Sequence, residues 1–281
     1  MKKFILSLLL VFMAAGASMA QSYPFSALDT NFTTPYLLLP NGFQYSIIFQ
    51  QNQNVLVGTN VNRPARGNHD YIMYIPNNGS STNGWLFINH ETSDSNSFLG
   101  DGGGASTFQV TKVGNNWYPS GPFRHMGFSH LGGTLSNCAG GSAILANGNI
   151  LTAEEFPPVN NLSLYNNGAG VRDTTDFGGY PKYMNYGWMV ECNVQGDTAI
   201  RKSFQMGRFS HEAALVMPDG RTVYLTDDNS GGCFFKFVAN TFGDYSAGQL
   251  FAYKQFGSTG TWLPMPMNRD SLNNARDVAQ R

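Results

Sequence analysis

DGRTVYLTDD at positions 219–228 decides the fold class, because a turn, a short strand and two carboxylates follow one another in it. Asp-Gly is a strong signal for a tight hairpin turn, and the β-branched and aromatic residues after it favour a strand. NGWLFINHE at 83–91 and NGNILTAEE at 147–155 repeat the order of turn, apolar strand and acidic end. We therefore expect hairpins whose second strands end in carboxylates.

Other apolar runs are also short and are bounded by Gly, Asn, Pro or Asp, which is typical of strands. Examples are YSIIF at 45–49, YIMYI at 71–75 and CFFKF at 233–237, and the one plausible helix lies at 270–281. The imperfect repeat predicts an all-β protein, and we favour a β-propeller, in which equivalent strand ends converge near the axis. A β-sandwich, in which the acids cap separate turns, is the alternative.

The composition excludes several classes of protein. Hydrophobic residues make up 42% of the 281 residues and charged residues 12%, which is the opposite of a disordered chain. The net charge of −1 provides no basic field for a nucleic-acid backbone, so we expect no nucleic-acid partner. The sequence also contains no Gly-x-Ser-x-Gly elbow, no His-Glu-x-x-His motif and no P-loop.

Residues 1–20 have the pattern of a secretory signal. Two lysines precede an apolar run at 4–17, and SMA at 18–20 supplies the small residues that signal peptidase requires. We predict cleavage after Ala20 and a periplasmic or secreted domain at 21–281; an uncleaved membrane anchor is the alternative. No later stretch has about 18 uninterrupted apolar residues, so we expect no membrane span in that domain.

Acidic residues near the ends of the repeated strands are the candidate metal ligands. They are Glu91, Glu154, Glu155, Glu212, Asp227 and Asp228. Carboxylates that converge repel one another unless a cation sits among them, and oxygen-rich clusters suit calcium, magnesium or manganese. The alternative for any single pair is an ordinary acidic turn.

The cysteines and one arginine add to this candidate site. Cys138, Cys192 and Cys233 leave at least one thiol unpaired in an exported protein. Cys138 precedes two glycines that would let the backbone approach a bound ion, and a thiolate beside carboxylates favours a transition metal; the alternative is a buried, inert thiol. Arg208 is suited to hold a phosphate beside such a cluster, unless it forms a surface ion pair.

Several short motifs occur in the same order as in one known family. They are NHE at 89–91, GGTLSNCAGG at 132–141, EE at 154–155, GRFSHEAA at 207–214, YLTDD at 224–228, FKFV at 235–238 and GTWLP at 260–264. With them the chain resembles the PhoX family of calcium- and iron-dependent alkaline phosphatases over most of its mature length. The resemblance implies a β-propeller that cleaves phosphate monoesters at a calcium–iron cluster on its axis.

The resemblance also implies roles for the matching residues. Cys138 and Glu212 would bind iron, whereas the paired glutamates and Glu91 would hold calcium. Arg208 would lie near the substrate phosphate, so Arg208 and Glu212 are the predicted catalytic residues. The full set of predicted metal ligands is Cys138, Glu91, Glu154, Glu155, Glu212 and Asp228.

The chain departs from the family in three ways. Residues 142–152 stand where the family has a Pro-Trp-Gly-Thr-Trp run before its paired glutamates. Thr226 stands where the family has a glycine before its paired aspartates, and family members continue past the segment that matches 273–281. We therefore expect an incomplete propeller whose C-terminal blades are missing from this chain. We favour a secreted, metal-dependent phosphoesterase with a small phosphorylated substrate. The alternatives are a non-catalytic calcium-binding propeller for surface binding, and other hydrolase chemistry such as lactone or phosphotriester cleavage.

Overall fold

The computed structural model describes residues 37–100, 102–166 and 176–281. The predicted signal at 1–20 lies outside these residues. The chain divides into two units, Met1–Ile47 and Ile48–Arg281. All described helices and strands belong to the second unit, and the paragraphs below concern that unit unless they say otherwise.

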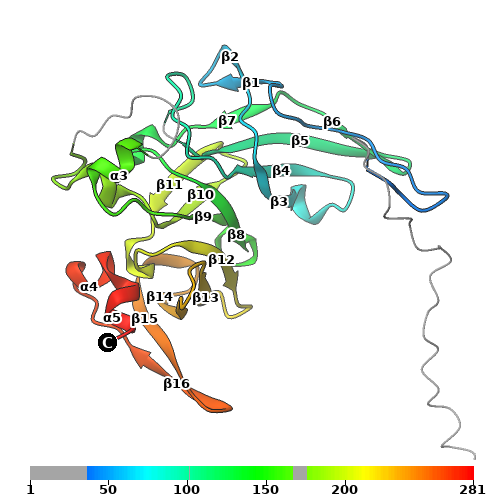
Figure 1. Cartoon of the computed structure of the whole chain (residues 1–281). Coiled ribbons are helices and arrows are strands. Elements are labelled where there is room, and N and C mark those ends of the chain that lie inside the picture. The colour runs from blue at the N-terminus through cyan, green and yellow to red at the C-terminus, as the bar shows by residue number, and fades with distance from the viewer. Residues whose placement is uncertain (1–36, 101, 167–175) are drawn as a thin grey trace, which may run out of the picture. The chain divides into compact units, whose positions relative to one another are not determined.

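The second unit is built mainly from strands, which form three sheets (Figure 1). The first sheet has the order β2-β1-β7-β5-β4-β3, with β6 paired to β5, the second has the order β11-β10-β9-β8, and the third runs from β12 to β16 in sequence. Neighbouring strands are antiparallel except β1 and β7, which are parallel. The all-β prediction is therefore confirmed.

The strands are short, as the Gly- and Asn-bounded apolar runs predict. The first sheet contains β1 (Asn54–Val57), β2 (Val61–Pro64), β3 (His69–Pro76), β4 (Asn83–His90), β5 (Ala105–Val113), β6 (Asn116–Pro119) and β7 (Arg124–Met126). The second contains β8 (Asn137–Ala143), β9 (Asn149–Glu154), β10 (Met189–Asn193) and β11 (Thr198–Lys202). The third contains β12 (His211–Val216), β13 (Thr222–Asp227), β14 (Phe234–Thr241), β15 (Asp244–Phe256) and β16 (Thr259–Pro264).

The helices are single turns or little more. They are α2 (Ile144–Asn147), α3 (Asn161–Asn166), α4 (Arg269–Asn273) and α5 (Ala275–Ala279), with 3-10 turns η1 (Asn77–Gly79), η2 (Ser129–Leu131), η3 (Lys182–Asn185) and η4 (Phe204–Met206). The predicted C-terminal helix is thus present as two short helices that meet at Asn274. Within the described residues, no helix is long and apolar enough to cross a membrane.

Strand β8 lies between the first and third sheets. It packs against β3 and β4 on one side and against β12 on the other. A Cβ at Gly140 would collide with the carbonyl oxygen of Leu151, and one at Gly141 with that of Ala214. The two glycines therefore let β8 approach β9 and β12 closely, which corrects the expectation that they admit a bound ion.

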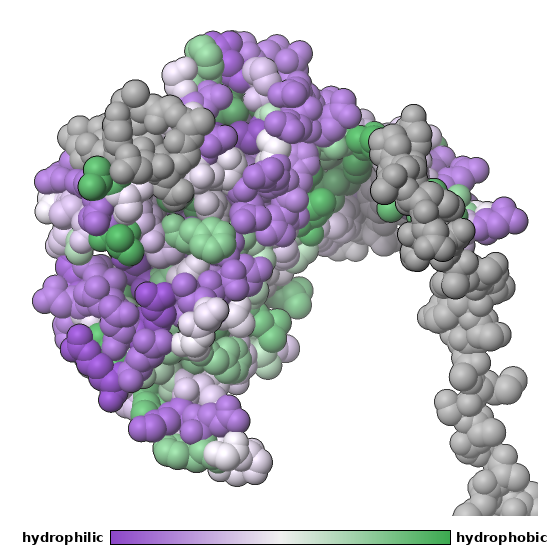
Figure 2. All heavy atoms as spheres, in the orientation of Figure 1, coloured by the Kyte–Doolittle hydropathy of each residue, from purple (hydrophilic) through white to green (hydrophobic). Residues whose placement is uncertain are grey.

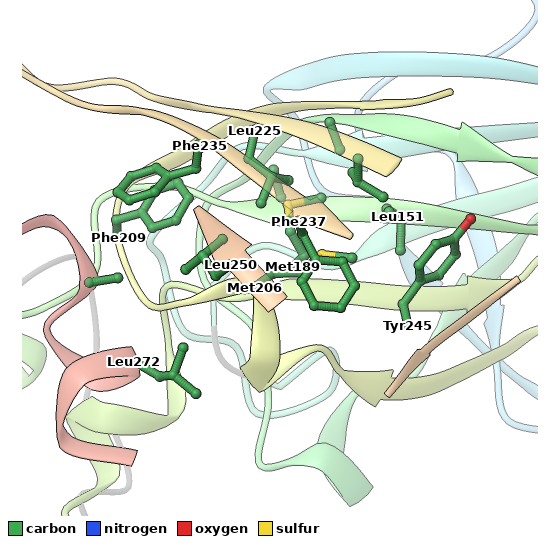
Figure 3. Packing of buried hydrophobic residues seen from close by; sticks show 14 of the residues in the cluster. Leu151, Met189, Met206, Phe209, Leu225, Phe235, Phe237, Tyr245, Leu250 and Leu272 are labelled. Atoms are coloured by element: carbon green, nitrogen blue, oxygen red, sulfur yellow. The ribbon is translucent and has the colours of Figure 1, made fainter. Parts of the chain in front are cut away.

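Two apolar cores join the sheets. The core between the second and third sheets includes Leu151, Met189, Phe235 and Phe237 (Figure 3), and the rings of Phe209 and Phe235 stack within it with centroids 4.4 Å apart. A second core, centred on Phe87, joins the first and second sheets. The middle sheet is covered on both faces, and every residue of β9 is consequently buried.

Two local predictions and one global prediction need comment. No strand forms at 45–49, because only Phe49 is buried there and Ile47 is 69% exposed. A hairpin around the Asn-Gly turn at 147–148 also predicts a strand directly before that turn, but residues 144–147 form helix α2 instead. The three sheets do not close into a ring within the described residues, so the propeller stays a prediction.

Candidate metal centre

A sulfur and two carboxylates from distant parts of the chain meet at one point. The Sγ atom of Cys138 and carboxylate oxygens of Glu155 and Glu212 all lie within 4.8 Å of one another. Cys138 belongs to β8, Glu155 directly follows β9, and Glu212 belongs to β12. This convergence follows from the packing of β12 along β8.

Strand pairing explains why these side chains point to the same place. The residue before each acid or thiol is paired across its hairpin: His69 with His90, Asn137 with Glu154, and His211 with Asp227. After each of these pairs the register shifts on the first strand, a local irregularity that re-aims the next side chain. Three sheets thus present equivalent positions at the same hairpin end.

The equivalent positions contain six possible ligands. On the first strands they are Asp70, Cys138 and Glu212, and directly after the second strands they are Glu91, Glu155 and Asp228. The sequence predicted five of these six. Asp70 was missed because a single aspartate within a strand carries no turn or repeat signal that would mark it.

Burial and neighbouring negative charge shift the pKa values of two of the acids. Burial, followed by a hydrogen bond with Asp228 and the charges of Glu212 and Glu91, raises the pKa of Glu155 to about 9. Burial, followed by the charges of Asp228 and Asp70, raises the pKa of the Glu212 carboxyl. Glu155 is only 3% exposed. In the described part of the chain, no lysine or arginine forms an ion pair with Glu155 or Glu212.

Cys138 shares this environment. Its thiol lies 3.1 Å from the carbonyl oxygen of His211 and 3.5 Å from that of Glu212. Burial, and then the charges of Glu212 and Glu155, raise the pKa of the thiol. A cation among these groups would reverse both effects, because it would favour the thiolate and the carboxylates. One sulfur with several carboxylates is therefore a donor set that fits a thiophilic metal beside a hard cation such as calcium.

A series of buried hydrogen bonds holds the backbone at Cys138 in place. Asn89 Nδ2 donates to the carbonyl oxygens of Cys138 at 2.6 Å and Ala139 at 2.8 Å. Its Oδ1 accepts from Thr152 Oγ1 at 2.8 Å, and Asn137 Nδ2 donates to Thr152 Oγ1 at 3.0 Å. These hydrogen bonds link the first and second sheets at Cys138. Both asparagines lie in the motifs at 89–91 and 132–141, but we predicted no role for them from the sequence.

Glu154 does not belong to this centre, which corrects its prediction as a calcium ligand. It is fully buried, and Lys202 Nζ donates to its two carboxylate oxygens at 3.1 and 3.0 Å. The backbone N–H groups of Leu135 and Trp188 donate to the same carboxylate at 3.0 and 3.2 Å. Successive residues of an extended chain point to opposite sides, so only one of the paired glutamates can face the thiol.

Arg208 also has a different role from the predicted one. Its Nε donates to the carbonyl oxygen of Tyr186 at 2.6 Å, and its Nη2 donates to those of Pro158 at 2.6 Å and Tyr183 at 3.1 Å. Burial lowers the pKa of the guanidinium to about 10, so it stays positive at neutral pH. The side chain therefore braces three backbone carbonyls, and its charge, rather than a forked hydrogen bond, is what it can offer an anion.

The two histidines of the quoted motifs, His90 and His211, are buried and contact neighbouring oxygen atoms. His211 is fully buried, its Nε2 lies 2.9 Å from the carbonyl oxygen of Gly207, and burial lowers its pKa to about 3. His90 is also fully buried, with its Nε2 2.8 Å from Ser106 Oγ. Cys138, Cys192 and Cys233 are all free thiols.

Comparisons with known proteins show the family of the chain and its fold. Residues 120–280 match the family model described as alkaline phosphatase PhoX. The solved structure of Pseudomonas fluorescens PhoX in complex with vanadate, a transition state analogue, is similar to this chain with a TM-score of 0.64 and 19% identity. The likeness covers 86% of this chain and 61% of that one, and at this identity it shows the fold alone. No curated protein matches the chain.

Proposed function

Because the chain belongs to the PhoX family of alkaline phosphatases, we propose that it is a metal-dependent phosphoesterase that hydrolyses phosphate monoesters. The convergence of Cys138 Sγ with the carboxylates of Glu155 and Glu212 is the observation that supports this most directly. The substrate would be a small phosphorylated compound. The signal pattern at 1–20 supports a periplasmic or secreted location.

The donor set divides naturally between two kinds of ion. Cys138 and Glu212 would hold iron, because thiolate sulfur prefers a transition metal. Glu155, Glu91 and Asp228 would hold calcium, which takes carboxylate oxygens. Metal ions in such a site polarise the phosphoryl oxygens and neutralise the charge of the substrate.

The residues of this chain would orient the ester for attack by water. Hydrolysis breaks the P–O bond to the leaving group, forms a bond from a water oxygen to phosphorus, and transfers a proton to the departing oxygen. Arg208 is positive, half-buried and part of the wall of a pocket that Phe156 and Ser210 also line, so it would raise the local potential for a phosphate dianion. Asn89 would hold the backbone of Cys138 in place.

We further propose that these sheets are blades of an incomplete β-propeller. The strands β3, β8 and β12 each lie at an edge of their own sheet, and β8 packs against both of the others. Inner strands of adjacent propeller blades have this arrangement. Further blades would be needed to close the ring, and the chain spans 61% of the length of the similar solved structure.

The test is to measure metal content and hydrolysis together. We expect protein produced with calcium and iron to contain both metals and to hydrolyse p-nitrophenyl phosphate. Cys138→Ala should lose iron and most of the activity, whereas Cys192→Ala, which removes another buried thiol, should keep both. Unchanged iron in Cys138→Ala would contradict the assignment of the sulfur as a ligand.

A non-catalytic calcium-binding propeller is the second candidate. Arg208 favours this candidate. Its Nε and Nη2 atoms donate to three backbone carbonyls, so they are not available for a two-pronged hydrogen bond to a substrate phosphate. This alternative predicts that calcium binds and stabilises the protein while no phosphate ester is hydrolysed. The same preparation of protein distinguishes the two functions.

A further inference from the structure

A pocket of about 920 Å³ opens beside the candidate metal centre. It lies between the loop that leads into α3, the segment 208–210 and the α4–α5 pair. Phe156 of its wall directly follows Glu155, and the N–H of Phe156 donates to Ser210 Oγ at 3.0 Å. The carbonyl oxygen of Ser210 accepts from the N–H of Asp228 at 2.9 Å. The pocket and the centre therefore share a wall.

One side of this pocket is formed by apolar side chains that remain open to solvent. Phe156 is 51% exposed, Val159 75% and Leu162 68%. Figure 2 shows apolar residues reaching the surface around α3 among hydrophilic ones. Single exposed apolar residues are common, but a group of them lining a concave site indicates a ligand with an apolar part.

Several polar groups on the inner wall of the pocket already have partners within the protein. Arg208 donates to three carbonyl oxygens, and Ser210 Oγ accepts from Phe156. Asn229 Nδ2 donates to Asp227 Oδ1 at 2.8 Å, and at the rim Arg276 lies 3.7 Å from Asp277. Where the polar groups of the wall are satisfied in this way, a polyhydroxyl ligand gains little there, because it would lose its own hydrogen bonds to water.

The backbone at Phe156 is held in an uncommon conformation. Its φ is 49°, in the left-handed region that a bulky aromatic residue rarely adopts. This turn lets the side chain of Glu155 point inward to the thiol while the ring of Phe156 lines the pocket. Backbone strain of this kind costs free energy and is found most often at functional sites.

We infer that this pocket receives the leaving group of the phosphate ester, and that Phe156 and Leu162 make the enzyme select esters of apolar alcohols over esters of polyhydroxyl alcohols. The inference rests on the proposed phosphoesterase function. The phosphoryl group would lie at the metal centre, and the apolar part of the ester would extend along the shared wall into the pocket.

A series of straight-chain alkyl phosphates tests the inference. Ethyl, butyl and hexyl phosphate have leaving groups of nearly equal acidity, so their kcat/KM values differ chiefly by contact with the pocket. We expect kcat/KM to rise by about tenfold or more from ethyl to hexyl phosphate, because each buried methylene adds up to about fourfold. Glycerol 2-phosphate should be a poorer substrate than butyl phosphate. A flat series would overturn the inference.

Two variants and one control locate the effect. Phe156→Gly and Leu162→Ser should each lower the hexyl-to-ethyl ratio by about threefold or more. Glycine fits a positive φ, so Phe156→Gly should keep or raise thermal stability while it loses selectivity. Leu145→Ser removes a 93% exposed leucine from the opposite end of the β8–β9 hairpin and should leave the ratio unchanged. An unchanged ratio in both pocket variants would overturn the inference.

Binding of non-hydrolysable alkyl phosphonates separates this inference from the proposed function. If no ester is hydrolysed, the function is wrong, and calorimetry still compares ethyl- with hexylphosphonate on the metal-loaded chain. Tighter binding of hexylphosphonate that weakens in Phe156→Gly would support the pocket assignment. Equal binding of the two phosphonates would refute it.

Discussion

Replacing Glu154 with glutamine should destabilise the protein without removing its metal, whereas the same change at Glu155 should remove metal without destabilising the fold. The two glutamates are neighbours in sequence and were predicted to share one role. The structure gives them opposite surroundings: Glu154 faces a lysine, and Glu155 faces a thiol and other acids. The pair therefore provides an internal control.

The size of the Glu154→Gln effect follows from its burial. Lys202 and Glu154 are 2% and 0% exposed at the side chain, and the nitrogen and oxygen are 3.0 Å apart. Glutamine is isosteric but neutral, so the lysine charge would stay buried without its counter-charge. Removing one partner of a buried ion pair costs about 3–5 kcal/mol. Glu154→Gln combined with Lys202→Met should recover much of that loss, because no buried charge remains.

Urea unfolding of chelator-treated protein and elemental analysis of the loaded protein are the two assays. Glu155→Gln removes a carboxylate that only other acids and a thiol surround, so metal-free stability should stay the same or rise near pH 8. Its bound calcium should fall. If Glu154→Gln changed stability by less than about 0.5 kcal/mol, well below the cost of an uncompensated buried charge, and also stripped the metal, the division of roles would be refuted.

Three further predictions concern the same region. Because the folded-state pKa of Glu155 is raised to about 9, its stabilising contribution is complete below about pH 4.5 and is lost as the pH rises toward 9. Metal-free protein should therefore lose up to about 1.4 kcal/mol per pH unit within that window relative to Glu155→Gln, and identical pH profiles of unfolding would contradict this. Asp70→Asn should weaken calcium binding, measured by titration, because Asp70 is the first-sheet equivalent of Cys138; unchanged affinity would exclude it from the centre. Asn89→Leu should shift the thiolate-to-cobalt absorption band of cobalt-loaded protein, whereas the control Thr152→Ser, which keeps the hydroxyl that donates to Asn89, should leave the band near its parent position; an unchanged band in Asn89→Leu would contradict the positioning role.

Much of the site was predictable from sequence because it repeats locally. The motif of turn, strand and acid at 83–91, 147–155 and 219–228 correctly marked strand ends that come together. Such a pattern is visible because hairpin turns and strand residues are decided over a few neighbours. The strand predicted at 45–49 does not form. Its residues favour a strand, but no neighbouring strand pairs with them.

The errors at Glu154 and Arg208 have a common physical cause. The partner of Glu154 lies 48 residues away at Lys202, and Arg208 donates to Pro158, 50 residues away. A sequence shows that a charge will be costly to bury, but it does not show which distant group will compensate it. Chain alternation placed Glu154 and Glu155 on opposite sides, yet only the packing of β12 against β8 decided which side held the thiol.

Around this centre, the presence or absence of a basic partner distinguishes structural acids from candidate metal ligands. Glu154 with Lys202 and Glu191 with Arg201 are acids that already have a basic partner, so neither pair needs a further cation. The six equivalent positions of the three hairpins instead gather five acids and a thiol. Burial and like charge raise the pKa of Glu155 and Glu212, and neither has a lysine or arginine partner in the described chain. Such a group is unfavourable in a folded protein unless positive charge is supplied from outside the chain, and this imbalance argues for a metal centre independently of any family likeness.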